Sequence, residues 1–377
     1  MRKRLLLLSA YDAPSHAHWR HQLTTQLPEF DWTELYLPPR YFNWRIRSNA
    51  MQWASTEHNY LSREYDLVLA TSMVDLASLR GLIPKLAKIP NVLYFHENQF
   101  AYPTGQQRSD NIEPQIVPLY AVLCADTIIF NSVFNRDTCL EGARKLAKRL
   151  PEGLPEVLFT KLENARVLPV PLSTTEDIHQ NQSALPADSP MEIVWNHRWE
   201  HDKGTDLLAA IVEQTKYERL RFRFHIVGQQ FRDRPKEFDA IDRHLNQISA
   251  FFEMHRGEFG YIDDSHRYQA LLKKCHVVLS TAKHDFQGLS VQEACLAGCQ
   301  AAVPDRVVYP EYMPPQFRYQ VSKDPQQTAA AAITLLKNIR KNLDRGMRHR
   351  IDLSYYCSPE LLNRYRDLFS SMISNRT

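Results

Sequence analysis

Glycine is rare in this sequence, with 11 copies among 377 residues. No G-x-G-x-x-G run occurs, although that run would form the phosphate-binding turn of a dinucleotide-dependent dehydrogenase. The sequence therefore disfavours a nicotinamide dehydrogenase.

Cysteine is also rare, and its six copies follow no zinc-ligand spacing. This density is too low for a fold held together by disulfides, so we expect reduced thiols and a cytoplasmic protein. The cysteines therefore indicate neither a metal site nor a disulfide framework.

Long apolar runs are absent as well, and none approaches the roughly 20 residues that a membrane span needs. Basic residues precede an apolar run at the N-terminus, as in signal peptides, but the run is short and charge and proline follow at once. We interpret residues 5–9 as a first buried strand and expect no membrane partner.

The remaining composition is that of a globular protein, with 44% hydrophobic and 24% charged residues. The length suggests two domains. A net charge of +3 does not by itself demand a nucleic acid partner, so local basic clusters have to carry that inference.

Short apolar runs alternate with amphipathic segments, which is typical of α/β folds with parallel sheets. The predicted strands are residues 5–10, 66–72, 91–97, 126–132, 165–172, 191–197, 222–228 and 276–282. The predicted helices include residues 204–216, 265–275, 290–298 and 359–373.

A polar stretch with prolines divides this pattern in two. We predict two Rossmann-like domains, residues 1–172 and 191–358, joined by a linker over residues 173–190. Residues 359–377 are expected to form a C-terminal helix that packs back toward the first domain. Ligands of this α/β class bind at the carboxyl ends of strands, so a cleft between the domains is the expected site.

Two cations follow the predicted strand 191–197. Arg198 and Lys203 stand just before a helix start near Gly204. Such a pair suits a diphosphate, because the helix dipole and the free backbone amides add to the attraction. The alternative is a solvated turn in which Glu200 and Asp202 neutralise both cations.

The stretch HDFQGLSVQE holds the next candidates. Gly288 lets a ligand approach the backbone, and the amides of Gly288 and Leu289 can point at a phosphate. Glu293 can accept hydrogen bonds from ribose hydroxyls, and Asp285 from a sugar ring. The structural alternative is a capping box in which Ser290 and Glu293 satisfy backbone amides at a helix start. No metal is needed, because arginine and lysine carry the compensating charge.

His96 and Glu97 end a predicted strand within the aromatic run YFHENQFAYP. The carboxyl end of a strand is where sites form in this fold class, so both side chains are candidates. The alternative for His96 is a structural histidine.

Together these motifs resemble the retaining GT-B glycosyltransferases of the glycogen-synthase-like clan. The resemblance rests on Arg198 and Lys203, the strand-end Gly228, the FGYI turn that contains Tyr261, and the pair of acids that ends at Glu293. It covers nearly the whole second half. It implies a GT-B fold, with two Rossmann-like domains facing a cleft.

The first half narrows the resemblance. The runs LLLSAYDAPSHAHW, LPPRYFNWRIR, DLVLATSMVDLASLRGL and HENQFAYP are similar to the tRNA-queuosine mannosyltransferase family over most of residues 1–172. Four positions depart from the usual pattern. Asp285 replaces a glutamate, His197 and Gln229 stand where glycines are usual, and Asp12 begins a segment that replaces a glycine pair.

The resemblance implies transfer of mannose from GDP-mannose to the cyclopentene-diol of queuosine in a tRNA anticodon loop, with retention of configuration and without a cofactor. It assigns catalytic roles to His96, Asp285, Arg198 and Lys203, and donor binding to Arg198, Lys203, Gly228, Tyr261, Gly288, Leu289 and Glu293. It assigns acceptor binding to Ser15, His16, Arg40, Trp44, Arg45, Arg47, Glu97 and Asn98.

A tRNA partner requires basic surface with aromatic rings. The run LPPRYFNWRIR interleaves Arg40, Arg45 and Arg47 with Trp44, which suits phosphate contacts and stacking on unpaired bases. Residues 143–149 and 337–350 offer further basic patches. The alternatives are an amphipathic segment that covers the core and ordinary solvated faces.

Three functions stay open on the sequence. The first is the tRNA-queuosine mannosyltransferase. The second is a retaining GT-B enzyme that uses another nucleotide sugar or a non-tRNA acceptor. The third is a tRNA-binding module without catalysis, for which Arg198 and Lys203 would be dispensable.

Overall fold

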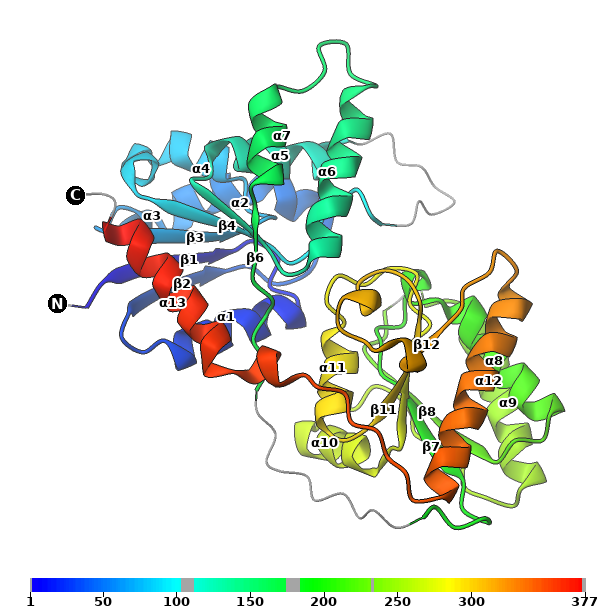
Figure 1. Cartoon of the computed structure of the whole chain (residues 1–377). Helices are drawn as coiled ribbons and strands as arrows, with labels where there is room; N and C mark the ends of the chain where they lie inside the picture. The colour runs from blue at the N-terminus through cyan, green and yellow to red at the C-terminus, as the bar shows by residue number, and fades with distance from the viewer. Residues whose placement is uncertain (1, 103–111, 174–183, 232–233, 375–377) are drawn as a thin grey trace. The chain divides into compact units, whose positions relative to one another are not determined.

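The chain folds into two compact units, each built around a six-stranded sheet (Figure 1). The computed structural model describes residues 2–102, 112–173, 184–231 and 234–374. The first unit comprises Met1–Ser173 and Ser354–Thr377, and the second comprises Thr174–Leu353. The C-terminal segment thus joins the first unit from Ser354, ahead of the boundary expected at residue 359.

The first sheet has the strand order β2-β1-β3-β4-β5-β6, and all neighbouring strands are parallel. Its strands are β1 (Arg4–Ser9), β2 (Asp31–Tyr36), β3 (Leu67–Thr71), β4 (Asn91–Phe95), β5 (Thr127–Phe130) and β6 (Arg166–Val167). Its central strands are apolar and fully buried, because helices cover both faces of a parallel sheet.

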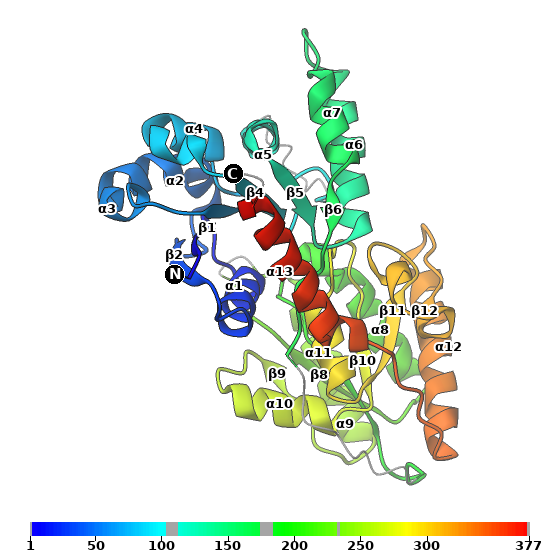
Figure 2. The same cartoon turned by 60° about the vertical axis from the view of Figure 1, so that its left-hand side comes forward.

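One face of this sheet packs on a large helical layer. That layer contains α2 (Phe42–Thr56), α4 (Leu76–Leu82), α5 (Glu113–Cys124), α6 (Val133–Ala147) and α7 (Glu156–Glu163). The short helices α3 (His58–Leu61), η1 (Pro84–Lys88) and η5 (Ser354–Cys357) also belong to this unit. The other face carries α1 (Pro14–Gln26) and α13 (Pro359–Ser374), which lie side by side in Figure 2.

The C-terminal helix α13 is an integral part of the first unit. Its residue Tyr365 accepts a hydrogen bond from the indole of Trp19 at 3.3 Å and donates to carbonyl oxygens just after β6. The Phe369 ring makes edge contacts with Phe30 and Trp32. These contacts explain why the amphipathic pattern of the last segment forms a helix here, because its apolar side is buried.

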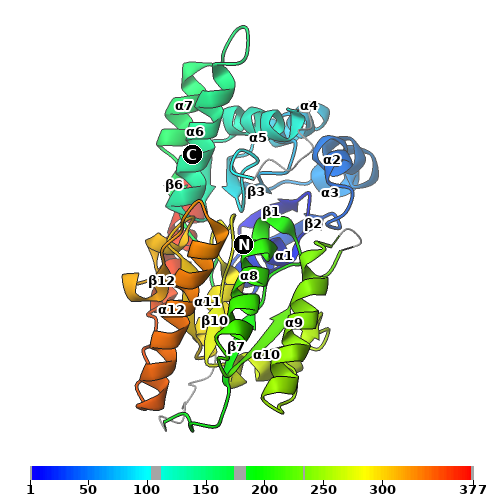
Figure 3. The same cartoon turned by 90° about the vertical axis from the view of Figure 1, so that its right-hand side faces the viewer.

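The second sheet has the order β12-β11-β10-β7-β8-β9 and is parallel throughout. Its strands are β7 (Met191–Trp195), β8 (Phe222–Val227), β9 (Phe259–Gly260), β10 (Val277–Leu279), β11 (Gln300–Pro304) and β12 (Arg318–Tyr319). Its helices are η2 (His201–Lys203), α8 (Thr205–Tyr217), α9 (Glu237–Phe251), α10 (Ser265–Lys274), α11 (Leu289–Leu296), η3 (Tyr309–Glu311), η4 (Pro315–Phe317) and α12 (Pro325–Asp344). Figure 3 shows α12, α8 and α9 in one layer.

Every strand and helix predicted from the sequence is present, which confirms the α/β interpretation. The last predicted strand of the first unit shrinks to β6, because Pro169 and Pro171 cannot continue a sheet ladder. Strands β2, β9, β11 and β12 were not predicted. Strand β2 is a partly exposed edge strand without an apolar run, and β9 and β12 are only two residues long.

The predicted linker 173–190 lies mostly outside the described residues. Its described end packs on the second unit, where Leu185 donates its amide to the carbonyl of Leu343 at 2.9 Å. Arg340 donates to the carbonyl of Ser189 at 2.7 Å. In the described part of the chain, no helix combines the length and apolar character of a membrane span.

Candidate functional site

Three loops of the second unit leave the same edge of its sheet. They follow β7, β8 and β10, which are parallel strands. Parallel strands end at one edge, and this is the edge where α/β proteins bind ligands. The motifs that the sequence singled out around residues 198, 228 and 285 therefore belong to one loop cluster.

Lys203 occupies the centre of this cluster. The residue is only 8% exposed, and Nζ donates to the carbonyl of His284 at 2.8 Å and pairs with Asp202 at 3.2 Å. The hydroxyl of Thr281 donates to the Lys203 carbonyl at 2.7 Å. The cation is thus fixed next to the residue that precedes Asp285.

Gly204 makes this close packing possible. It is the N-cap of α8 with φ 71°, and a Cβ there would lie 2.0 Å from the Thr281 carbonyl oxygen. An L side chain would be strained at this φ and would push the two loops apart. Glycine is therefore required at position 204 for Lys203 to be held in this place.

Asp202 stays ionised at this position. Burial opposes the charge, but the neighbouring His284 ring and the cations of Lys203 and Arg198 outweigh it and hold the pKa of Asp202 well below its usual range. The site consequently keeps a carboxylate beneath its lysine at any ordinary pH.

Arg198 differs from Lys203 in its exposure. It is about one-third exposed, and its Nη2 lies 2.9 Å from Glu200 Oε2. Both acids named in the alternative interpretation do pair with the two cations, as that alternative expected. Lys203, however, is buried, so the interpretation as a solvated turn applies to Arg198 alone.

Gly228 supports the Arg198 loop from the end of β8. Its φ is 151°, and a Cβ would lie 1.8 Å from the His197 carbonyl oxygen. The Trp199 amide donates to the Gln229 carbonyl at 2.9 Å. The structure thus gives Gly228 a packing role, and its contact with a donor stays a prediction.

The capping-box prediction at Ser290 is wrong. Helix α11 begins at Leu289, and its N-cap is Gly288 with φ 76° and no side-chain capping bond. Ser290 is therefore already inside the helix, and its carbonyl accepts a hydrogen bond from Asn196 at 2.7 Å. No side chain caps this N-terminus, and the contact of the Gly288 and Leu289 amides with a phosphate stays a prediction.

Asp285 lies in the chain between this helix start and His284, whose carbonyl binds Lys203. Its Oδ2 accepts a hydrogen bond from the Tyr309 hydroxyl at 3.0 Å. A Cβ at Gly288 would lie 2.7 Å from the Tyr312 hydroxyl oxygen, so the tyrosines approach the helix start closely. Asp285 itself is partly exposed and reaches the edge of the sheet.

Glu293 is the second acid of the cluster, and α11 carries it. Burial raises the pKa of Glu293 to about 7. Tyr268, whose hydroxyl accepts a hydrogen bond from Asn196 at 2.9 Å, has its pKa raised by burial and by the charge of Glu293. Near neutral pH, Glu293 can therefore accept or donate a hydrogen bond.

Tyr261 lies just after β9 and is largely exposed. No hydrogen bond of its side chain is present among the described residues. Its predicted contact with the donor stays a prediction.

His96 is the corresponding strand-end residue of the first unit. Its ring stacks on His16 with centroids 4.0 Å apart and meets Trp19 and Tyr94 edge-on. Neither ring nitrogen has a hydrogen-bond partner in the described part of the chain. Burial, with added effects of His16 and His18, holds the pKa of His96 well below its usual value, so the ring is neutral.

The residues after His96 are held by their own loop. Glu97 accepts a hydrogen bond from Tyr102 at 2.8 Å. The Asn98 side chain donates to Asn135 and Thr138, each at 2.9 Å, and accepts two backbone amides of its own loop. Asn98 therefore fixes the loop, and its predicted acceptor contact is untested.

Asp12 marks the largest departure from the family pattern. It pairs with Arg20 at 2.9 Å, and Arg20 also pairs with Glu34 at 2.5 Å and lies over the Tyr36 ring. A largely buried ion-pair cluster therefore stands where the resemblance led us to expect a glycine pair. Ser15, two residues into α1, is partly buried beside His16.

Helix α2 combines both interpretations of its sequence. Ile46 is buried in the core, as an amphipathic cover requires, whereas Trp44 is 59% exposed and Arg40 is exposed. Arg45 donates to Gln52 at 2.7 Å on the same helix. The exposed side of α2 therefore offers the Trp44 ring, and Arg40, just before the helix, adds an exposed cation.

Family comparisons agree with this arrangement. Residues 4–172 match the model described as tRNA-queuosine alpha-mannosyltransferase N-terminal. A Drosophila melanogaster protein named tRNA-queuosine alpha-mannosyltransferase is 26% identical over 378 residues, which are 98% of this chain and 97% of that protein. Residues 4–172 thus match the N-terminal model of the tRNA-queuosine alpha-mannosyltransferase family, and the similarity to one protein of that name extends over 98% of the chain.

Solved structures show the fold of this chain. A structure named "Trehalose-6-phosphate from E. coli bound with UDP-2-fluoro glucose" matches with a TM-score of 0.64 and 13% identity, over 98% of this chain and 99% of that one. Sucrose-phosphate synthase from Thermosynechococcus elongatus matches with a TM-score of 0.64 and 15% identity, over 98% and 100%. The predicted GT-B fold is thereby confirmed.

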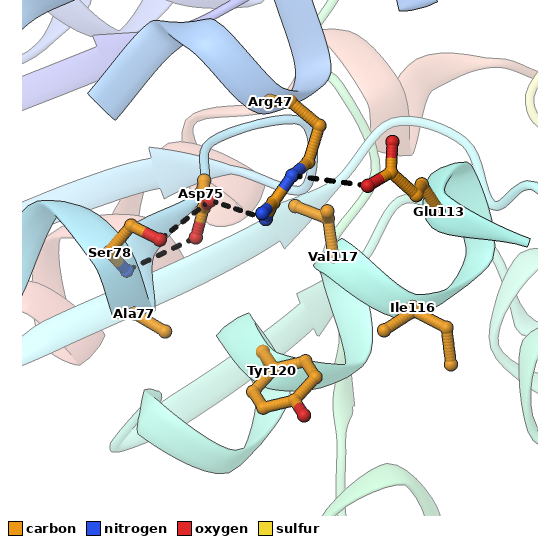
Figure 4. A pocket seen from close by; sticks show the side chains of 8 residues that line it. All are labelled: Arg47, Asp75, Ala77, Ser78, Glu113, Ile116, Val117 and Tyr120. Carbon is orange, nitrogen blue, oxygen red and sulfur yellow. Dashed lines mark hydrogen bonds and ion pairs between the residues drawn. The ribbon is translucent and has the colours of Figure 1, made fainter. Parts of the chain in front are cut away.

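The first unit also contains a cavity that the sequence did not suggest. Figure 4 shows Arg47 between Asp75 at 3.2 Å and Glu113 at 3.4 Å, above Tyr120. The cavity measures about 280 Å³. Arg47 stays half-exposed beside these acids, and its contact with tRNA stays a prediction. Local sequence patterns miss the two ion pairs because both acids are distant from Arg47 in the sequence.

The other two basic patches are internally paired in part. Lys145 lies 2.6 Å from Glu141, and Arg144 pairs with Glu163. Arg340 pairs with Asp344 at 2.7 Å. These contacts are those of ordinary solvated faces. Among the described residues, no group of three or more histidine, cysteine or acidic side chains is arranged to hold a metal.

Proposed function

We propose that this chain transfers mannose from GDP-mannose to the cyclopentene-diol of queuosine in a tRNA anticodon loop, with retention of configuration. The similarity to this family supports the sugar and the acceptor. One observation carries the chemistry: the buried Lys203 ammonium is held at the carbonyl of His284, directly before Asp285. A fixed cation thus stands beside the acid expected to meet the sugar.

The diphosphate would bind to Lys203, Arg198 and the amides at the start of α11. Positive groups that are already fixed stabilise the charge that grows on a departing diphosphate, because no reorganisation is needed during the reaction. Lys203 is buried and anchored, whereas Arg198 is more exposed and can swing from Glu200 to a phosphate.

The sugar transfer itself balances without a protein nucleophile. The bond between the anomeric carbon and the diphosphate oxygen breaks, and a queuosine hydroxyl oxygen forms the new bond on the same face. The hydroxyl proton passes to the departing phosphate oxygen. Asp285 and His96 would bind sugar hydroxyls, and Glu293 would bind the ribose.

His96 suits its role because it is neutral and its ring nitrogens have no hydrogen-bond partner among the described residues. A neutral imidazole has one N–H donor and one acceptor nitrogen, and both are unused among the described residues. The ring is immobilised by His16 and Trp19. A sugar hydroxyl would satisfy a buried polar atom that is otherwise costly to leave alone.

The tRNA would meet the exposed side of α2 in this proposal. Trp44 can stack on an unpaired base, and Arg40 can contact a phosphate. Ser15 and Glu97, at the carboxyl edge of the first sheet, are proposed to contact the queuosine diol.

The decisive experiment measures labelled mannose moving from GDP-mannose into tRNA. Matched tRNA preparations with and without queuosine are the two arms. Incorporation into the queuosine-containing arm alone is the expected result. Absence of transfer to either tRNA, together with transfer to a lipid or a small glycan, would overturn the proposal.

The donor is tested separately with a panel of nucleotide sugars and thermal unfolding. A ligand that binds only the folded state raises the unfolding temperature by mass action. GDP-mannose is expected to give the largest rise. A larger rise with a UDP-sugar would instead favour a GT-B enzyme with another donor.

A further inference from the structure

Four side chains of the second unit form an unbroken series of hydrogen bonds that ends on Asp285. His197 Nε2 lies 3.0 Å from Ser280 Oγ, and Ser280 Oγ lies 2.7 Å from the Tyr309 hydroxyl. The Tyr309 hydroxyl donates to Asp285 Oδ2 at 3.0 Å. The members come from the ends of β7 and β10, from η3 and from the loop before α11.

This series is buried up to its last member. Ser280 and Tyr309 are fully buried, and His197 is 3% exposed. The Ser280 amide donates to the Ala302 carbonyl at 2.9 Å, and Tyr319 donates to the Ser280 carbonyl at 2.6 Å. The middle of the series is therefore anchored to strand β11 and to β12.

The number of protons fixes the direction of the bonds. A carboxylate only accepts, so the single proton of Tyr309 goes to Asp285. The Tyr309 oxygen must then accept, and Ser280 gives its only proton to it. Ser280 is left with an acceptor oxygen, which requires a proton on His197 Nε2.

The protonation of His197 and of Tyr309 is consistent with this order. Burial lowers the pKa of His197 to about 4, although the charge of Asp285 opposes the shift, so the ring carries one proton at neutral pH. Burial and the charge of Asp285 raise the pKa of Tyr309 well above its usual value. Tyr309 therefore keeps its proton.

We propose that His197, Ser280 and Tyr309 are positioning residues that hold Asp285 Oδ2 and aim its second carboxylate oxygen at the donor sugar. All three bonds point the same way and polarise one another, which strengthens each of them in a dry interior. The assignment of Asp285 to the sugar rests on the proposed function. The arrangement of the hydrogen bonds does not.

The first test needs no substrate. Nitrogen-15 NMR of histidine-labelled protein reports which ring nitrogen is protonated, and the His197 signal is assigned from its loss in His197→Gln. A neutral ring with the proton on Nε2 is expected at pH 7. A proton on Nδ1 would overturn the proposal, because Ser280 would then donate to His197 and not to Tyr309.

The second test asks whether Tyr309 acts through Asp285. In Tyr309→Phe the kcat of mannose transfer is expected to fall about tenfold, the effect of one lost hydrogen bond. The affinity for GDP alone should be unchanged, since GDP has no sugar at this position. In an Asp285→Asn background, Tyr309→Phe should have no further effect on kcat.

Two outcomes would contradict that role. If the kcat losses of Tyr309→Phe and Asp285→Asn multiply in the double variant, Tyr309 does not act through Asp285. If Tyr309→Phe weakens GDP binding as much as it lowers kcat, its role is general packing.

A conservative pair at His197 completes the design. His197→Gln keeps an N–H donor near the Nε2 position and should retain most of the kcat, whereas His197→Leu should lose as much as Tyr309→Phe. Equal kcat in the two variants would count against the proposal. If wild-type protein transfers no mannose, the proposed function fails, while the NMR result still decides the order of the bonds.

Discussion

The two units share one sheet architecture but differ in what they place at its carboxyl edge. The second unit places charged groups there and fixes them, with Lys203 buried, the partly buried Asp202 paired with it, and Asp285 bonded to Tyr309. The first unit stacks rings there, with the neutral His96 on His16, and its charged groups Asp12 and Arg20 pair with each other beside them. The same fold therefore offers a rigid ionic site in one unit and an aromatic site in the other.

The physical reason lies in the loops and not in the strands. Both sheets consist of buried apolar strands, which do not determine ligand specificity. A diphosphate gains most from charges that are already in place, whereas bases and sugar rings gain from stacking and single hydrogen bonds. This difference between the two units can be tested by substitutions, from the largest expected effect to the smallest.

Removing the buried cation should break the ionic site. Lys203→Met is expected to lower kcat/KM for mannose transfer 10²–10³-fold, because a fixed charge opposite the departing diphosphate is lost. Lys283→Met is the matched control, since Lys283 pairs with Asp206 at 2.6 Å at an exposed position. Equal activity of the two variants would contradict the role of Lys203.

The titration of Glu293 should make the stability of the second unit depend on pH. Its pKa of about 7 in the folded chain exceeds the value of 4.5 expected when unfolded, so between these pH values the native state holds a proton that the unfolded chain has released. Stability from this group is therefore lost as pH rises from about 4.5 to 7, by on the order of 3 kcal/mol. Urea unfolding at pH 5 and pH 7 measures the change.

Glu293→Gln serves as the control for that titration. The amide mimics the protonated acid at every pH, so the variant should be more stable than the wild type at pH 7 and similar to it at pH 5. The same pH dependence in both proteins would show that Glu293 has an ordinary pKa.

Exposed rings of the first unit should matter for tRNA and not for the donor. Trp44→Ala is expected to weaken tRNA binding by about 1–3 kcal/mol, the contribution of one stacked base. Met51→Ala on the same helix removes a comparably exposed apolar side chain and should have little effect. Filter binding at fixed salt compares the two, and equal affinities would exclude stacking on Trp44.

The return of the C-terminal helix should affect the first unit modestly. Tyr365→Phe removes hydrogen bonds to Trp19 and to the segment after β6, and about 1 kcal/mol of stability is expected to be lost. The unfolding temperature of the first unit should fall by about 2–4 °C. The exposed Tyr60→Phe should leave it unchanged, and a similar fall in both variants would refute the contribution of Tyr365.

The candidate donor site could be located from the sequence because its motifs are local. Arg198, Lys203 and Gly204 follow a buried apolar run within a few residues, and the run predicts a strand. Gly288 and Glu293 likewise belong to one short segment. Parallel pairing then brings both segments to one edge.

Partners distant in the sequence could not be predicted in the same way. His197 and Ser280 are 83 positions apart, and Arg47 and Asp75 are 28 apart, yet each pair is in contact. The capping box failed for a related reason: a left-handed Gly288 starts α11 before Ser290, in a place shaped by Tyr309 and Tyr312.

The sequence by itself determined most of the strands, the order of the motifs and the family resemblance. These depend on apolar periodicity and on residues close along the chain. Only the tertiary structure decided which groups are fixed: Lys203 on the His284 carbonyl, Asp285 on Tyr309, and His96 between rings. The reason is that burial and hydrogen bonding depend on neighbours in space, which parallel strands supply from remote parts of the chain.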